Sequence, residues 1–185
     1  PTPVQRALRS LQDRAWQLSS KTLRCPRPSS APIPVHVMGI LNATPDSFSD
    51  GGQFEQLDRA VAHAQEMLED GVSILDVGGE SSRPGADPVP SNIEIDRVIP
   101  IIKAVREISD VVISIDTVKS DVAEAAIDAG ADIVNDISAG CHDDRMFDVV
   151  RANRSGLVLM HMKGRPKTMQ KGDLSTESVL EDVLD

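Results

Sequence analysis

Polar side chains that could bind a ligand are concentrated in residues 38–52, which read MGILNATPDSFSDGG. An apolar run ends there in an amide, several hydroxyls, a proline and two acids beside glycines. If residues 35–41 form a buried strand, Asn42 and the polar residues after it leave the carboxyl end of that strand in one loop. In α/β proteins the functional residues gather at this end of the strands, so we expect a site here.

Four later apolar runs also end in polar residues, and amphipathic stretches lie between the runs. The runs are residues 73–79, 111–116, 131–136 and 156–162, and the intervening stretches lie near 57–70, 93–108, 118–129 and 143–154. Short apolar strands that alternate with helices predict a parallel sheet covered by helices. Polar residues at the end of every strand favour a TIM-type (β/α)8 barrel over a doubly wound sheet, whose site lies at one crevice.

Five strands are fewer than such a barrel contains, and a complete barrel typically needs about 250 residues. This chain has 185 residues and stops in VLEDVLD, a helix-like pattern. We therefore expect a barrel truncated to about five βα units. Alone, this fragment should be inactive or very weakly active.

The N-terminal segment differs from the rest in charge. Residues 1–32 carry six basic residues and one acid, and the prolines at 26–34 are typical of an extended linker. Rough helical spacing over residues 4–18 indicates the tail of a preceding domain, with an organelle-targeting segment as the alternative. We expect residues 1–32 to be a linker or domain tail and residues 33–185 to be the partial barrel.

Composition limits the class of protein. The net charge of -10 argues against a nucleic-acid partner, because phosphates require a basic surface. No apolar run is long enough to cross a membrane. Cys25 and Cys141 have no metal-ligand spacing, which predicts free thiols in a reducing compartment. We expect a soluble cytoplasmic or mitochondrial protein.

Five segments together closely resemble the dihydropteroate synthases, which belong to the pterin-binding barrel family. They are residues 38–52, LDVGGESSRPGA at 75–86, SIDT at 114–117, IVNDISAG at 133–140 and LMHMKGRPKTMQ at 159–170. The resemblance implies a transferase of folate biosynthesis. Such an enzyme joins 6-hydroxymethyl-7,8-dihydropterin diphosphate to p-aminobenzoate and releases diphosphate with the help of Mg²⁺, and sulfonamides are expected competitors.

The resemblance implies that Asp116 and Asn135 hydrogen-bond the pterin ring. A buried heterocycle with several donors needs fixed acceptors, and a carboxylate would also stabilise cationic character as the carbon–oxygen bond breaks. Asn42 is similar to the family asparagine that helps to bind Mg²⁺ and diphosphate, and one amide oxygen with substrate phosphate is a plausible Mg²⁺ site. We expect Asp116, Asn42 and Arg83 to be the catalytic residues.

Two loops complete the implied site. Thr44 and Phe48 belong to the first loop, with Phe48 against the p-aminobenzoate ring. In the second loop, the planar donor fork of Arg83 suits diphosphate. The expected substrate-binding residues are Thr44, Phe48, Asp76, Ser82, Arg83, Pro84, Asp116, Asn135 and Met160. Ser82 stands where the family more often has threonine.

Several of these residues have structural alternatives. Asp116 could cap the helix that begins near Val118, Asn42 could close an Asx turn, and Phe48 could pin its loop. Asp76 could orient the two loops without touching ligand. His161 is an acid–base candidate or a packed histidine at the rim.

Two other functions remain open at this point. A corrinoid-linked methyltetrahydrofolate methyltransferase shares the pterin barrel but has no use for a diphosphate loop such as SSRPG. A non-catalytic pterin-binding paralogue is the second. Multifunctional folate proteins place a pyrophosphokinase domain before the barrel, and the family usually forms homodimers. The family's later aspartate, lysine, arginine and histidine motifs would lie beyond Asp185.

Overall fold

A parallel sheet with the strand order β3-β4-β5-β6-β7 forms the centre of the computed structural model. The structure describes residues 15–24, 35–43, 53–81, 88–162, 175 and 178–184. The strands are β3 (Met38–Asn42), β4 (Ile74–Gly78), β5 (Val112–Asp116), β6 (Ile133–Asp136) and β7 (Gly156–Leu159). Strands that follow one another in the chain are neighbours in the sheet. Over the part of the chain that the structure describes, the order never reverses, so this sheet lacks the switch point of a doubly wound fold.

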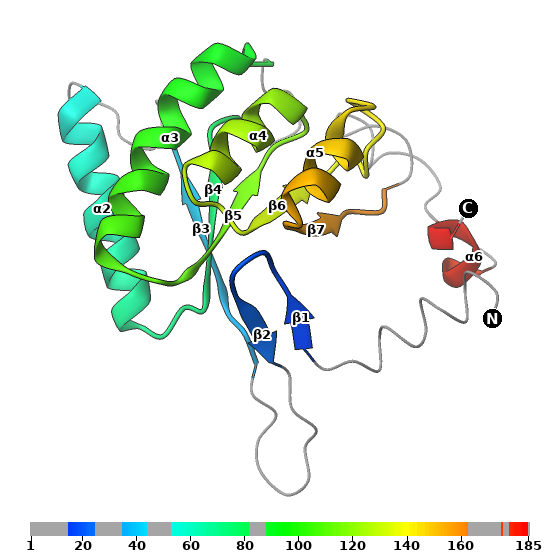
Figure 1. Cartoon of the computed structure of the whole chain (residues 1–185), viewed down its shortest axis with the longest axis horizontal. Helices are drawn as coiled ribbons and strands as arrows, with labels where there is room; N and C mark the ends of the chain where they lie inside the picture. The colour runs from blue at the N-terminus through cyan, green and yellow to red at the C-terminus, as the bar shows by residue number, and fades with distance from the viewer. Residues whose placement is uncertain are drawn as a thin grey trace, which may run out of the picture.

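Four helices lie side by side along one face of this sheet (Figure 1). They are α2 (Gln53–Glu69), α3 (Ser91–Ile108), α4 (Ser120–Asp128) and α5 (Met146–Asn153). A short helix, α6 (Val179–Leu184), is the last described element and matches the helix-like pattern of the final residues. Among the described residues, no helix combines the length and apolar character needed to cross a bilayer.

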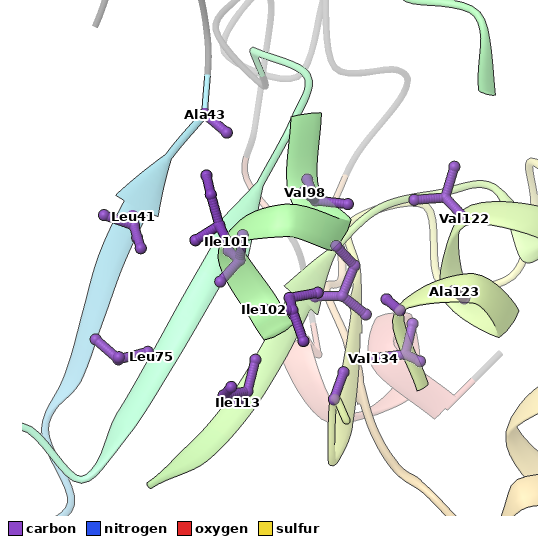
Figure 2. Close-up of a cluster of buried hydrophobic side chains, with 14 of the residues drawn as sticks. Leu41, Ala43, Leu75, Val98, Ile101, Ile102, Ile113, Val122, Ala123 and Val134 are labelled. Atoms are coloured by element: carbon purple, nitrogen blue, oxygen red, sulfur yellow. The ribbon is translucent and has the colours of Figure 1, made fainter. Parts of the chain in front are cut away.

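The main core lies between the sheet and these helices. Leu75, Ile113 and Val134 project from three strands toward Ile102 and Ala123 of the helices (Figure 2). Because side chains alternate along a strand, the residues between these apolar positions face the opposite side of the sheet. That alternation leaves the opposite face, which carries no helix among the described residues and is called the helix-free face below, to the polar residues predicted for the site.

The amino end of the helix-free face is covered by a β-hairpin of β1 (Ala15–Gln17) and β2 (Thr22–Arg24). Its apolar side chains bury a second cluster against the first residues of the sheet strands. This cluster contains Leu18, Leu23, Ile74, Val112 and Ile133, with Val158 packed beside it.

Lys21, in the turn of the hairpin, adds polar contacts between the hairpin and the sheet. Its Nζ atom forms an ion pair with Asp132 Oδ2 at 3.0 Å and donates to the carbonyl of Val111 at 3.1 Å. Arg106 of α3 forms an ion pair with the same carboxylate. The predicted helical pattern is therefore wrong at Ala15–Gln17, where the chain forms a strand that packs with the sheet. The prolines predicted to form a linker at 26–34 lie outside the described residues.

Candidate functional site

One row of residues crosses the carboxyl end of the sheet on its helix-free face. The strand register aligns Asn42 with Gly78, Gly78 with Asp116, Asp116 with Asn135, and Asn135 with Val158. Asn42, Asp116 and Asn135 come from different segments of the sequence, and the sheet brings these three predicted site residues to the same level. Asn42 is exposed, whereas Asp116 and Asn135 are half-buried.

Gly78 leaves room for about one methyl group between two of these side chains. A Cβ atom built on Gly78 would lie 3.6 Å from Asp116 Oδ2 and 3.7 Å from Asn42 Oδ1. Both oxygens therefore border the volume that a side chain would occupy. A small group placed there would meet an amide oxygen on one side and a carboxylate oxygen on the other.

Asp76 lies two positions before Gly78 on the same face of β4. Its side chain is buried, and its Oδ2 atom accepts a hydrogen bond of 3.0 Å from the amide nitrogen of Asn135. Burial raises the pKa of Asp76, and interactions with the Ser114 and Asn135 side chains offset part of that rise. The observed side-chain contact of Asp76 is with Asn135, and its expected roles, orienting the first two loops or contacting ligand, stay predictions.

The electrostatics of the site centre on Asp116. Burial, followed by the negative charges of Asp76, Glu94, Asp136 and Glu80, raises the pKa of Asp116 to about 7. A cationic or hydrogen-bond-donating ligand would favour the ionised form and lower this pKa. Asp116 is therefore suited to a group that becomes more positive during a reaction.

The described hydrogen bonds place the cap of α4 on another residue than Asp116. Asp143 Oδ2 accepts a 2.9 Å hydrogen bond from the backbone N–H of Ser120, the first residue of α4. Hydrogen bonding by Ser120 lowers the pKa of Asp143 below its ordinary value. The capping alternative for Asp116 is thus wrong in this structure.

A charged cluster that follows the carboxyl ends of β4 and β5 was missed from the sequence. Lys119, which follows β5, forms ion pairs with Glu80 after β4 and with Glu94 of α3. Glu94 is fully buried. Burial acts to lower the pKa of Lys119, but hydrogen bonds and the charges of the two glutamates outweigh this effect and raise it. The cluster fixes the chain just after β4 to α3 and to the segment after β5.

The loop after β6 is organised by Asp136, which is buried. Its carboxylate accepts hydrogen bonds from the backbone N–H groups of Ser138 and Gly140 at 2.7 and 2.8 Å. Gly140 has a φ of +79°, a left-handed conformation that glycine adopts without strain. Asp136 therefore shapes the loop, and Asn135 beside it faces the site.

The remaining predicted residues fall at the end of β7 or outside the described ranges. Met160 is half-buried one position beyond β7, and its backbone N–H donates to Asp136 O at 3.3 Å. His161 is exposed. The predictions for Thr44, Phe48, Ser82, Arg83 and Pro84 lie outside the described residues.

The side-chain oxygens of Asn42, Asp116 and Asn135 are of the type that binds a hard divalent cation. Such a cation would share its remaining coordination positions with a ligand. Within the described ranges, no group of three or more His, Cys, Asp or Glu side chains is placed to hold a metal ion. Mg²⁺ commonly keeps several waters and shares few protein oxygens with substrate phosphates. Asn42 Oδ1, beside the space at Gly78, suits that kind of site.

Comparisons with known proteins agree with this arrangement. The family model described as "Pterin binding enzyme" matches residues 38–185. The mitochondrial folate synthesis bifunctional protein of Arabidopsis thaliana is 44% identical over 97% of this chain and 31% of its own length. This chain spans half the length or less of the curated relatives that it matches.

Solved structures are similar in both sequence and fold. The dihydropteroate synthase of Yersinia pestis, in complex with a sulfonamide drug, has a TM-score of 0.76 and 39% identity, covering 92% of this chain and 58% of that one. The Burkholderia cenocepacia synthase complexed with 7,8-dihydropteroate has a TM-score of 0.72 and 43% identity, covering 91% and 54%. These neighbours have the TIM barrel fold, so the sheet and helices described here are part of such a barrel. The chain belongs to the pterin-binding enzyme family and resembles its dihydropteroate synthases.

Proposed function

We propose that the full-length protein containing this chain is a dihydropteroate synthase of folate biosynthesis. It would condense 6-hydroxymethyl-7,8-dihydropterin diphosphate with p-aminobenzoate to give 7,8-dihydropteroate and diphosphate. The observation that carries this proposal is the row of Asn42, Asp116 and Asn135 at the carboxyl edge of the sheet, with open space at Gly78. Membership of the family supports it.

The proposed chemistry uses Asp116 as an electrostatic catalyst. The bond between the methylene carbon of the pterin and the diphosphate oxygen breaks, and the carbon becomes more positive. The bonding electron pair leaves with the diphosphate. The amine of p-aminobenzoate forms the new carbon–nitrogen bond and gives up its proton to the surrounding water. Because the Asp116 carboxylate is half-buried, its negative charge would act on the pterin with little screening by water. Asn135, its neighbour in the register, would help to hold the ring.

The leaving group is assigned to the opposite end of the row. Asn42 would hold Mg²⁺ through its amide oxygen, together with oxygens of the diphosphate. When bound, the cation would stabilise the negative charge that develops on the leaving diphosphate. Ser82 and Arg83 are proposed to bind the same diphosphate on the basis of the family resemblance.

The second substrate is assigned to the first and second loops. Thr44, Phe48 and Pro84 would form the p-aminobenzoate pocket, and Met160 would border the ligands from β7. A sulfonamide would compete with p-aminobenzoate in this pocket. The sulfonamide complex of the Yersinia pestis relative supports that part of the proposal.

The organisation of the full-length protein is proposed from the Arabidopsis relative. That relative is a bifunctional folate synthesis protein, and it matches nearly the whole of this chain, including the basic N-terminal residues. We therefore place a second folate-synthesis domain before the barrel. A homodimer and a cytoplasmic or mitochondrial location are part of the same proposal, and the name of the relative supports the mitochondrial one.

An activity assay tests the function. The full-length protein and this chain alone would be compared with dihydropterin diphosphate, p-aminobenzoate and Mg²⁺. We expect turnover by the full-length protein, inhibition by a sulfonamide, and loss of at least a hundredfold in kcat for Asp116→Ala. A folded full-length protein that binds 7,8-dihydropteroate but never turns over would instead support a non-catalytic pterin-binding protein.

A further inference from the structure

Asp76 is placed to act on the site through another residue. Its side chain is 5% exposed, and its strand position is aligned with Ile40 and Ser114, one row below Asn42, Asp116 and Asn135. The half-buried Asn135 lies above it and donates its Nδ2 hydrogen to Asp76 Oδ2 at 3.0 Å. A ligand at the rim would therefore meet Asn135, and Asp76 would lie behind it.

This hydrogen bond decides which way the amide of Asn135 faces. An ionised carboxylate accepts hydrogen bonds and has none to donate. The amide nitrogen therefore turns toward Asp76 and donates one of its two N–H hydrogens to it, and this direction of the amide leaves the amide oxygen for other partners. A free asparagine side chain would offer either its donor or its acceptor to a ligand.

We propose that Asp76 is a positioning residue that fixes the Asn135 amide so that Asn135 presents a hydrogen-bond acceptor to the substrate ring. The inference rests on the proposed function and deepens it. Asn135 is aligned with Asp116 in the register, so the site offers two neighbouring acceptors. Such a pair matches a ring edge with adjacent N–H donors, such as the 2-amino group and ring nitrogen of a pterin.

The burial of Asp76 supports a role beyond packing. A carboxylate inside a protein loses its hydration, and that loss destabilises the fold unless hydrogen bonds compensate it. The row below Asp76 contains Ile74 and Val112, which are buried and apolar. An apolar residue at position 76 would continue that cluster, but it could not orient the amide of Asn135.

Binding measurements on the full-length protein test the proposal. Asp76→Asn keeps the shape of the side chain but can donate or accept, so the Asn135 amide loses its fixed orientation. We expect about tenfold weaker binding of 7,8-dihydropteroate and a tenfold higher KM for dihydropterin diphosphate, with the KM for p-aminobenzoate unchanged. Ser114→Ala is the matched control, because it removes a neighbour of Asp76 and keeps the bond to Asn135.

A double-mutant cycle separates positioning from general stabilisation. In an Asn135→Ala background, Asp76→Asn should cause no further loss of dihydropteroate affinity. The same tenfold loss in that background, or normal affinity in the single variant, would overturn the proposal for Asp76 while leaving the synthase function intact. A wild-type protein that neither binds dihydropteroate nor turns over would overturn both.

If the Asp76→Asn variant fails to fold, a comparison of two ligands on the wild-type protein still tests the proposal. The wild-type protein should bind an analogue of dihydropteroate that lacks the 2-amino group at least tenfold more weakly than dihydropteroate itself. Equal binding of the two ligands would contradict the assignment of Asn135 as an acceptor.

Discussion

Asn42 and Asp116 face the same space from opposite sides of Gly78. A Cβ atom on Gly78 would lie 3.7 Å from the Asn42 amide oxygen and 3.6 Å from an Asp116 carboxylate oxygen. These are ordinary van der Waals distances, so a methyl group would fit without displacing either residue. It would nevertheless occupy the place where a ligand atom could reach both oxygens. At this position, then, folding would tolerate alanine and ligand binding would not.

Gly78→Ala should therefore reduce activity while the protein stays folded. We expect the melting temperature to stay within a few degrees of wild type and kcat/KM for the pterin substrate to fall at least tenfold. Thermal unfolding and steady-state kinetics on the full-length protein would measure the two quantities.

The adjacent glycine provides the matched control. A Cβ atom on Gly79 would lie 2.8 Å from Val98 Cγ1 and 2.9 Å from Glu94 Cγ, which is too close for real atoms. Gly79→Ala should lower the free energy of unfolding by about 1–3 kcal/mol, because α3 must shift. Equal destabilisation by the two substitutions would contradict the assignment of open space to Gly78.

The pKa of Asp116 predicts how stability depends on pH. It is about 7 in the folded protein, against about 3.9 for an unfolded aspartate. Between these values the folded state holds one more proton than the unfolded state, so this group makes stability fall as the pH rises from about 4 to about 7.

Asp116→Asn should remove the loss of stability that ionisation of Asp116 causes as the pH rises. We expect little change in the free energy of unfolding at pH 4 and a gain of up to about 4 kcal/mol at pH 8, because one pKa unit corresponds to about 1.4 kcal/mol. Urea unfolding at the two pH values would measure the difference. A variant that is equally stabilised at both would show that ionisation of Asp116 is not responsible.

The same titration should appear in the kinetics. If ionised Asp116 is needed, kcat/KM of the wild-type protein should rise with pH through about 7. After burial, the charge of Asp76 is the next largest cause of the raised pKa. Asp76→Asn should therefore move this rise to lower pH, and an unmoved profile would exclude coupling between the two carboxyl groups.

The site row was predictable because its members occupy equivalent places in a repeating pattern. Asn42, Asp116 and Asn135 each stand at or next to the end of an apolar strand, and parallel register then aligns them. Strand and helix positions followed from hydrophobic periodicity for the same reason. The Asp76–Asn135 bond needed the structure, because two strands separated in the chain by 59 positions make it.

The hairpin and the buried charges show where sequence patterns are weak. Strands of three residues, such as Ala15–Gln17, are too short to show an alternating pattern, and contacts of Leu18 and Leu23 with the sheet decide their structure. Glu94 lies in the first turn of α3, where an acid is usual on an exposed helix surface. Its burial depends on Lys119 from another segment, so helical spacing alone could not reveal it.

Removal of an apolar hairpin contact should destabilise the protein. Leu18 is 2% exposed and packs in the cluster with Ile74, Val112 and Ile133. Leu18→Ala should lower the free energy of unfolding by about 2–4 kcal/mol, because it leaves a cavity. Urea unfolding of the full-length protein would measure this loss. Lysine or glutamate at the exposed position of Thr22 should change stability little, and similar losses at both positions would contradict the packing of the hairpin on the sheet.

Loss of Lys119 should also be costly, because it leaves a buried charge without its partner. Glu94 is fully buried, with 0% of its surface exposed to solvent, and Lys119 forms an ion pair with it. Lys119→Met should lower the free energy of unfolding by about 3–5 kcal/mol. The double variant Lys119→Met with Glu94→Gln should recover much of this loss, since it removes the unpaired carboxylate.

Arg145→Met is the control: its ion pairs with Asp121 and Glu124 are on the surface, and such pairs contribute less than about 1 kcal/mol. If Lys119→Met were no more destabilising than Arg145→Met, the ion pairs of Lys119 with Glu80 and Glu94 would not stabilise the fold.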